Sequence, residues 1–182
     1  MARKESVTEQ MILDTAFEMV KEGGFESITA RKVAEKAGCS TQPIFRVYKN
    51  MEELQHAVYE KAIVYFLEYY KAANKPSTVP FTNLGLTYIA FAREEKNYFK
   101  LLFVKGVPGG KSMYELLNGA DGNVVREINL ARSQGCTDPG AMFMKMWIFI
   151  HGAACMTLTG DYDLTDEETI SLLEKSYESF SQ

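Results

Sequence analysis

A single glycine between two short helical patterns is the feature that most restricts the fold of this chain. The spacing of apolar residues predicts one helix that begins at Thr29 and ends at Gly38, and another that begins at Ser40. Gly38 permits the left-handed backbone that a tight turn between helices requires. Two short helices joined by such a turn form a helix-turn-helix, in which the first helix supports the second.

A further amphipathic helix is predicted before this pair, over residues 8–22, with Ser6 or Thr8 as its cap and Gly23-Gly24 as its end. The second of the paired helices carries Pro43 in its first turn, where a missing N–H costs little. We expect the three helices to share one core made of Met11, Ile12, Ala16, Met19, Val20, Val33, Ala34, Ala37, Ile44, Val47 and Tyr48. Gln42, Arg46 and Lys49 fall on the outer face of the last helix.

The rest of the chain also shows helical periodicity, and we expect an all-α fold. Asn50 caps a long helix from Met51 to about Ala73, and Thr165 with Glu168 forms a capping box for the last helix. Five further helices are predicted over residues 82–93, 95–104, 112–118, 122–134 and 141–159. The predicted domains are a three-helix module, residues 1–50, and a helical bundle, residues 51–182.

Charge and cysteine content narrow the function classes. The net charge is −4, but residues 1–50 hold eight Lys and Arg against seven Asp and Glu, so this part is the least repelled by a polyanion. Three widely spaced cysteines, without a C-x-x-C motif, are typical of reduced thiols inside the cell. We expect a cytoplasmic protein without a membrane segment, because Lys145 and His151 interrupt the most apolar stretch, Ala141 to Leu158.

Two C-terminal helices are more apolar than one packed face requires. Residues 141–159 have apolar side chains on two faces, and the last helix lines up an apolar stripe from Ile170 to Phe180. A partner subunit would cover such surfaces, so we expect a homodimer. The predicted interface is made of Met142, Met146, Phe149, Ile150, Ala153, Ile170, Leu173, Tyr177 and Phe180.

The stretch I-T-A-R-K-V-A-E-K-A-G-C-S-T-Q-P-I-F-R-V-Y-K-N-M-E-E-L, Ile28 to Leu54, resembles the DNA-binding module of the TetR family of transcriptional regulators. The resemblance covers roughly residues 6–58, and W-I-F-I-H-G, Trp147 to Gly152, is similar to an element of some ligand-binding domains in that family. It implies an all-helical regulator with a DNA-binding domain, residues 1–50, and an effector-binding and dimerisation domain, residues 51–182. We expect a repressor that a small, largely apolar ligand releases from a palindromic operator.

The resemblance also implies roles for the matched residues. Phosphate contacts are implied for Thr29, Arg31, Ser40, Tyr48 and Lys49, and base or groove contacts for Thr41, Gln42, Pro43, Phe45 and Arg46. Two positions depart from the family pattern, since Phe45 stands where Tyr is usual and Met51 where Lys is usual. Both changes remove a contact to the DNA backbone, so we expect a modest affinity for DNA or a different phosphate footprint.

An effector site is predicted among the aromatic residues and methionines of the C-terminal part. A wide set of such side chains around one tryptophan suits an adaptable apolar pocket. The candidates are Tyr65, Tyr69, Tyr88, Phe91, Phe99, Phe103, Met113, Trp147 and His151. Each of them is also explained by an ordinary core, and His151 either anchors a ligand or bonds a neighbouring backbone group.

Other functions have less support in the sequence. We expect no metal, because His56 and His151 are the only histidines and no cluster has ligand spacing. We also expect no cofactor and no enzyme activity, since no nucleophile motif or nucleotide fingerprint is present. A dimerisation scaffold that regulates through a protein partner, without a ligand, remains an alternative, and so does an enzyme or carrier whose site is assembled from distant residues.

Overall fold

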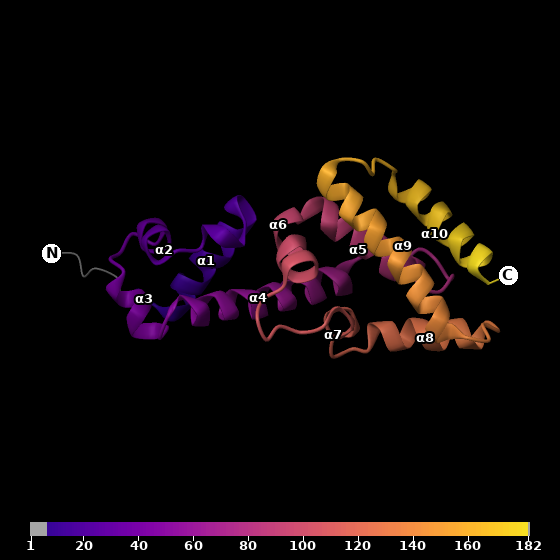
Figure 1. Cartoon of the computed structure of the whole chain (residues 1–182), viewed down its shortest axis with the longest axis horizontal. Coiled ribbons are helices and arrows are strands. Elements are labelled where there is room, and N and C mark those ends of the chain that lie inside the picture. Colours follow the sequence, from indigo (N-terminus) through magenta and orange to yellow (C-terminus); the bar gives the residue numbers. More distant parts are fainter. Residues whose placement is uncertain (1–6, 182) are drawn as a thin grey trace. The chain divides into compact units, whose positions relative to one another are not determined.

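The computed structural model describes residues 7–181, and every regular element in that range is a helix, which confirms the all-α prediction (Figure 1). The α-helices are α1 (Glu9–Gly23), α2 (Ala30–Lys36), α3 (Gln42–Val47), α4 (Met51–Ala72), α5 (Thr82–Glu94), α6 (Lys96–Phe99), α7 (Met113–Asn118), α8 (Asn123–Ser133), α9 (Pro139–Thr159) and α10 (Asp166–Phe180). A 3₁₀ turn, η1 (Phe25–Ser27), follows α1, and a π-helical segment, η2 (Lys100–Lys105), follows α6.

The chain divides into two compact units. The first unit holds residues 7–65 together with Asn97–Gly110, and the second holds Phe66–Lys96 together with residues 111–181. Helix α4 contributes its first fifteen residues to the first unit and its last turns to the second. The units therefore differ from the sequence division at residue 50, because a later segment of the chain packs with the helix-turn-helix.

Helix α1 supplies the core of the first unit. The hydroxyl of Thr8 accepts a hydrogen bond from the Met11 N–H at 3.2 Å, as predicted for a cap, and Ser6 lies outside the described residues. Ile12, Ala16 and Val20 are fully buried. The expectation that Met11 points inward was wrong, since Met11 is 40% exposed. Each residue turns a helix by about 100°, which carries Met11 off the face that Ile12 and Ala16 share.

Helix α5 is the centre of the second unit. Most of its residues are buried, and it packs against both α9 and α10, which run side by side in Figure 1. Gly85 allows this close approach, because a Cβ atom there would lie 2.9 Å from the side chain of Ile150 and 3.0 Å from that of Leu173. A side chain of any size would push the helices apart.

Helix α9 is, within residues 7–181, the one helix long and apolar enough to cross a membrane by length and composition. It packs against α5, α8 and α10. The side chain of Asp138 caps its start by accepting from the Ala141 N–H at 2.9 Å. The predicted capping box of the last helix is confirmed, since Thr165 and Glu168 satisfy each other's backbone N–H groups.

The helix predicted over residues 95–104 is interrupted. Helix α6 ends at Phe99, and the chain continues as η2, in which the Gly106 N–H bonds the Leu101 carbonyl five residues earlier at 3.0 Å. Leu101, Leu102 and Phe103 are buried in this segment. Apolar periodicity does not distinguish a π-turn from an α-turn, so the residue pattern does not predict the π-helical segment.

Replacing Gly85 with alanine tests the packing of α5 against α9 and α10. The added methyl group overpacks the contact with Ile150 and Leu173, and we expect the free energy of unfolding to fall by about 1–3 kcal/mol. Gly140→Ala is the matched control, because the nearest atom to its Cβ is an Asp138 oxygen at 3.6 Å. Chemical denaturation of both variants checks this, and equal stability of the two would contradict it.

Candidate nucleic-acid interface

The turn between α2 and α3 is closed by backbone hydrogen bonds. The Cys39 N–H bonds the Ala34 carbonyl at 2.9 Å, and the Gly38 N–H bonds the Glu35 carbonyl at 3.2 Å. This pattern requires a left-handed residue after the helix, and Gly38 has φ +66°. A Cβ on Gly38 would meet no atom within 4 Å, so the backbone conformation, not space, demands the glycine.

Helix α3 has six residues, too few for a helix that is stable by itself. Its capping differs from the prediction, because the residue before the first turn is Thr41, not Ser40, and it makes no side-chain cap bond. Thr41 has right-handed helical backbone angles, in which a hydroxyl does not reach the N–H groups of the first turn. Ile44, which is fully buried, fixes the helix against the rest of the first unit.

The outer side of the helix-turn-helix is solvent-exposed. Thr29, Arg31, Ser40, Thr41, Gln42, Phe45, Arg46 and Lys49 are exposed, and Pro43 is half-buried. Ser40, Gln42, Pro43, Phe45 and Arg46 line a surface hollow of about 640 Å³. The structure thus brings five of the ten residues predicted to meet DNA together around one hollow.

Arg46 already has a partner in the free protein, because its guanidinium donates to the Val7 carbonyl at 3.4 Å. This contact is long and exposed, so it holds the side chain only weakly. Phe45 is 48% exposed, so its ring is accessible from solvent. A basic and an aromatic side chain are therefore both available on the outer side of α3.

The junction between α3 and α4 is held by a reciprocal cap. The Asn50 side chain accepts from the Glu53 N–H at 2.9 Å, which confirms Asn50 as the cap, and the Glu53 carboxylate accepts from the Lys49 N–H at 2.5 Å. The backbone of Lys49 is thereby occupied, and only its side chain is free to meet a phosphate. Met51 begins α4 and is half-buried.

Tyr48 differs from the other predicted DNA contacts because it is buried. Its side chain is 4% exposed, and its hydroxyl has no hydrogen-bond partner within the described part of the chain. Burial, and then the carboxylates of Glu9 and Glu53, raise the pKa of this hydroxyl. An unpaired buried hydroxyl costs stability, and in this arrangement it does not face a phosphate.

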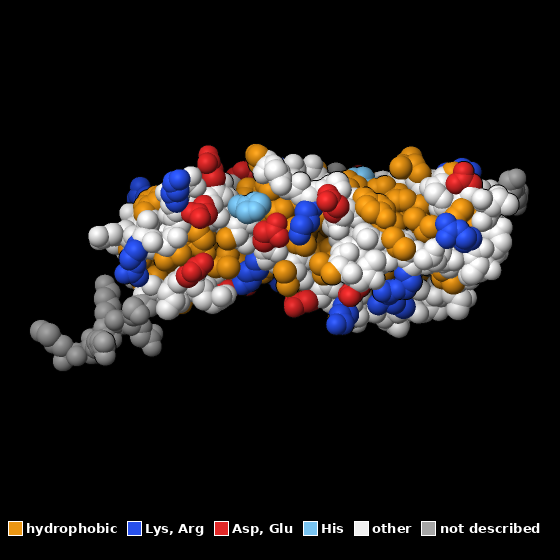
Figure 2. Space-filling model, turned by 90° about the horizontal axis from the view of Figure 1, so that it is seen from below, with side chains coloured by type: hydrophobic (Ala, Val, Ile, Leu, Met, Phe, Trp, Pro, Cys, Tyr) orange, Lys and Arg blue, Asp and Glu red, His pale blue; other side chains and the backbone are white. Residues whose placement is uncertain are grey.

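No broad basic surface surrounds the helix-turn-helix on the face drawn in Figure 2. Lys and Arg side chains there alternate with Asp and Glu along that face. Pairs such as Lys36 with Glu22 neutralise some cations locally. Binding to a polyanion would therefore depend on a few well-placed contacts more than on a diffuse positive field.

The predicted effector residues are divided between the two units. Tyr65, Phe99 and Phe103 belong to the first unit, whereas Tyr69, Tyr88, Phe91, Met113, Trp147 and His151 belong to the second. In the first unit the Tyr65 ring lies against Phe17 and Tyr98, with centroids 5.8 and 5.3 Å apart. Aromatic packing in the first unit thus explains Tyr65, and the rings of Phe99 and Phe103 pack on each other with centroids 5.4 Å apart.

In the second unit a polar chain runs through an aromatic cluster. The Tyr88 hydroxyl lies 2.9 Å from Nδ1 of His151, and Nε2 of His151 lies 3.5 Å from the Cys155 sulfur. Trp147 stacks on His151 and donates its indole N–H to the Met113 sulfur at 3.1 Å. Burial lowers the pKa of His151, so the ring is neutral at pH 7.

Tyr69 is half-buried, and its hydroxyl donates to Glu94 at 2.8 Å. Desolvation first, and this carboxylate second, raise the pKa of Tyr69. Its ring lies 5.1 Å from Phe91, which is fully buried. Tyr69 and Phe91 therefore form a contact of their own inside the second unit.

The structure places five of the nine residues predicted for a dimer interface inside the chain's own core. These are Met142, Met146, Ile150, Ala153 and Leu173, all buried where α5, α9 and α10 pack together. The other four, Phe149, Ile170, Tyr177 and Phe180, are half-buried. The exposed face of α9 is instead the one with Met144, Ile148 and Met156. A helix that is apolar all round does not reveal from sequence which face turns inward.

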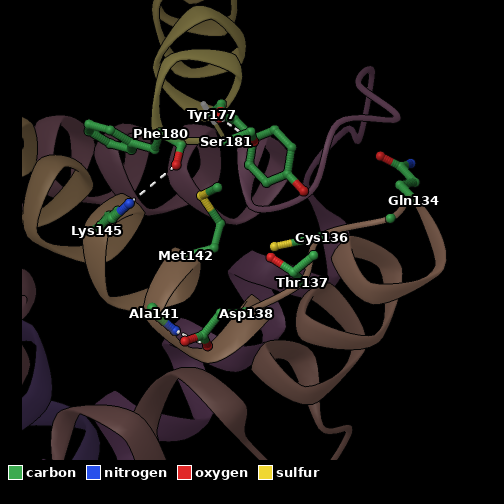
Figure 3. A pocket seen from close by; sticks show the side chains of 11 residues that line it. Gln134, Cys136, Thr137, Asp138, Ala141, Met142, Lys145, Tyr177, Phe180 and Ser181 are labelled. Atoms are coloured by element: carbon green, nitrogen blue, oxygen red, sulfur yellow. Dashed lines mark hydrogen bonds between the residues drawn. The ribbon is translucent and has the colours of Figure 1, made fainter.

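Three of the predicted interface residues line a cavity of about 290 Å³ that sequence reasoning missed (Figure 3). Met142, Tyr177 and Phe180 meet there with Cys136, from the loop between α8 and α9. Lys145 donates to the Phe180 carbonyl at 3.2 Å and ties α9 to the end of α10. The walls come from three separate segments, which no local sequence pattern brings together.

Comparison with known proteins decides the nature of the N-terminal helices. Residues 12–58 match the family model of bacterial regulatory proteins of the tetR family. The N-terminal domain is a TetR-family DNA-binding domain. No curated protein matches this sequence significantly.

Solved structures of transcriptional regulators share the fold over nearly the whole chain. A TetR family protein from Vibrio parahaemolyticus superposes with a TM-score of 0.67 at 19% identity, covering 93% of this chain and 96% of that one. A TetR-like transcriptional regulator from Rhodococcus sp. RHA1 gives 0.65 at 17% identity, with 98% and 97% covered. A transcriptional regulator from Pseudomonas aeruginosa PAO1 gives 0.62 at 12% identity, with 94% and 89% covered. The likeness extends the TetR fold to the C-terminal helices.

Tyr48→Phe separates the buried hydroxyl from the predicted phosphate contact. Because that hydroxyl is unpaired and buried, its removal is expected to raise the free energy of unfolding by about 1 kcal/mol and to leave DNA affinity unchanged. Denaturation and duplex titration measure the two effects. Lys49→Ala, which removes an exposed cation, serves as the positive control for weakened binding. If the Tyr48→Phe variant bound DNA several-fold more weakly than the wild type, the phosphate contact implied by the family would be supported instead.

Proposed function

We propose that this protein is a transcriptional regulator that reads duplex DNA with α3. The observation that carries the proposal is the two-sided character of that helix. Ile44 is fully buried, whereas Gln42, Phe45 and Arg46 are exposed around one hollow. A short helix fixed on one side and polar on the other fits the recognition helix of a helix-turn-helix, which enters the major groove.

The chemistry of the exposed residues suits base recognition. Gln42 can pair with the edge of adenine, and Arg46 with that of guanine, each through two hydrogen bonds. Pro43 offers an apolar contact to a thymine methyl group. Thr29, Arg31, Ser40 and Lys49 are proposed to hold phosphates and fix the orientation of the module. Thr41 and Phe45 are assigned to the groove wall.

The proposed regulator acts as a homodimer through α9. Met144, Ile148 and Met156 leave an apolar face exposed on this helix, and such a face is normally covered by a partner. A second copy would cover it by twofold symmetry and would present two copies of α3. The operator is then palindromic, with half-sites about 34 Å apart.

Regulation is proposed to pass through the C-terminal bundle. Residues 51–182 would bind the effector and form the dimer, and residues 1–50 would bind DNA in the cytoplasm. Tyr88, Trp147 and His151 form an aromatic cluster with one polar handle, a composition that suits a small, largely apolar ligand. A ligand that favours a spacing of the two reading heads unsuited to DNA would release a repressor. The rings pack on one another in this structure, so a scaffold without a ligand is the second candidate.

Arg46→Ala tests the assignment of α3 as the reading element. The variant is expected to lose one base preference in each half-site, by a factor of about 5 to 100, because one bidentate contact is removed. Selection of bound duplexes from a random library compares it with the wild type. Arg132→Ala, at an exposed arginine of α8, is the control and should keep every preference. An unchanged motif in Arg46→Ala would count against the proposal.

Ile148→Glu tests the proposed dimer surface. Ile148 is 66% exposed in the chain, so the variant folds, but a carboxylate in a closed interface weakens dimerisation by about two orders of magnitude or more. Analytical ultracentrifugation measures this. Val64→Glu, at a valine of α4 that is 54% exposed, is the matched control. A dimer of normal affinity in Ile148→Glu would place the interface elsewhere.

A further inference from the structure

A segment far along the sequence packs onto helix α1 of the DNA-binding domain. Tyr98 donates its hydroxyl to the Phe17 carbonyl at 3.1 Å, and its ring stacks on that of Phe17 with centroids 4.5 Å apart. The neighbouring Asn97 donates its side-chain amide to the Lys21 carbonyl at 2.9 Å. Two consecutive residues thus hold the C-terminal half of α1.

One of these bonds lies at the end of the helix. Helix α1 ends at Gly23, so the carbonyl of Lys21 is one of the last four, which receive no hydrogen bond from an N–H group of the same helix. Tyr98 is 1% exposed, so its bond to Phe17 is shielded from water. The ammonium group of Lys61 lies over the Phe17 ring, 4.8 Å from its centroid, and adds a cation–π contact.

The position of α1 matters for the reading helix. Both α2 and α3 pack against α1, and the buried Ile12, Ala16 and Val20 lie on it. A small rotation of α1 would therefore move the support on which Ile44 rests. Asn97 and Tyr98 bond to α1, and the Tyr98 ring also lies against Tyr65 of α4, so they reach the reading helix through the elements that support it.

The segment that follows Asn97 and Tyr98 has a helical form whose register can change. The segment η2, Lys100–Lys105, is π-helical, a conformation that is rare and tends to occur at functional sites. Each π-turn contains one more residue than an α-turn, so rewinding it changes the register of its neighbours. The chain enters and leaves the first unit at residues 96 and 111, which belong to the second. A change in the second unit thus has a covalent route to Tyr98.

We propose that Asn97 and Tyr98 are positioning residues for DNA binding, and that η2 is the element through which the second unit biases their hold on α1. The inference rests on the proposed function, since it concerns the affinity of the same α3 surface. It goes beyond that function by naming the residues that couple the two parts of the chain. A purely structural role for Tyr98 would affect stability alone.

Tyr98→Phe is the test variant, because it keeps the stacked ring and removes the hydroxyl. The domain then spends less time with α1 held, and the apparent affinity for a duplex selected by the wild type falls by about three- to fivefold. The salt dependence of binding stays unchanged, since the bound complex keeps its phosphate contacts. Asn97→Ala is expected to act in the same direction. Titrations are made well below the unfolding temperature of each variant.

Tyr162→Phe is the matched control. The Tyr162 hydroxyl lies 3.0 Å from that of Thr169 in the second unit, so this variant also loses one hydroxyl contact but none to α1. Its DNA affinity should equal that of the wild type. If Tyr98→Phe also bound DNA like the wild type, the inference would be overturned while the proposed function stood. If the wild type selected no duplex, both would fall.

Hydrogen exchange gives a second readout that stability alone does not move. Because coupling is reciprocal, DNA that favours the held form must favour the register of η2 that goes with it. Saturating the wild type with the selected duplex is expected to slow exchange of the Gly106 N–H, which bonds Leu101 five residues back. This slowing is expected to be reduced in Tyr98→Phe. Equal exchange with and without DNA in the wild type would refute a role for η2.

Discussion

The proposed DNA-reading surface of this protein depends on the burial of one side chain, that of Ile44. Helix α3 has six residues and no side-chain cap, so its helical form depends on tertiary packing. Ile44 supplies that packing from inside the first unit, and the turn at Gly38 fixes the direction in which α3 leaves α2. With Ile44 packed inward and the direction of α3 fixed, the side chains of Gln42 and Arg46 face the solvent. The reading surface is thus a consequence of core packing.

The distribution of charge along the chain makes the geometry of this surface more important for DNA binding. The protein is acidic overall, and its DNA-binding part has nearly balanced charge. A few directed contacts must then supply what a basic surface supplies elsewhere, and directed contacts are sensitive to small rotations. This sensitivity gives the hold of Tyr98 and Asn97 on α1 its significance. A domain bound by diffuse charge would tolerate a loosened α1, whereas one that depends on the placement of Arg46 would not.

Local signals in the sequence predicted local structure well. The caps at Thr8, Thr29, Asn50 and Thr165 and the left-handed turn at Gly38 each follow from the chemistry of one or two residues. Arrangements between distant segments were not predictable in this way. The inward face of α9, the π-turns of η2 and the buried Glu127, which accepts from the Phe81 N–H at 2.5 Å, depend on the packing of several helices. Their residue patterns are compatible with more than one arrangement.

The central claim is that α3 of two subunits reads a palindromic duplex. Selection of bound sequences from a random duplex library by the purified wild-type protein, repeated at two salt concentrations, tests it most directly. The account predicts an enriched inverted repeat with half-site centres about one helical turn apart, and the same motif at both salt concentrations. Retention without a sequence motif, lost as salt increases, would show that the protein binds only the phosphate backbone, and would contradict the account.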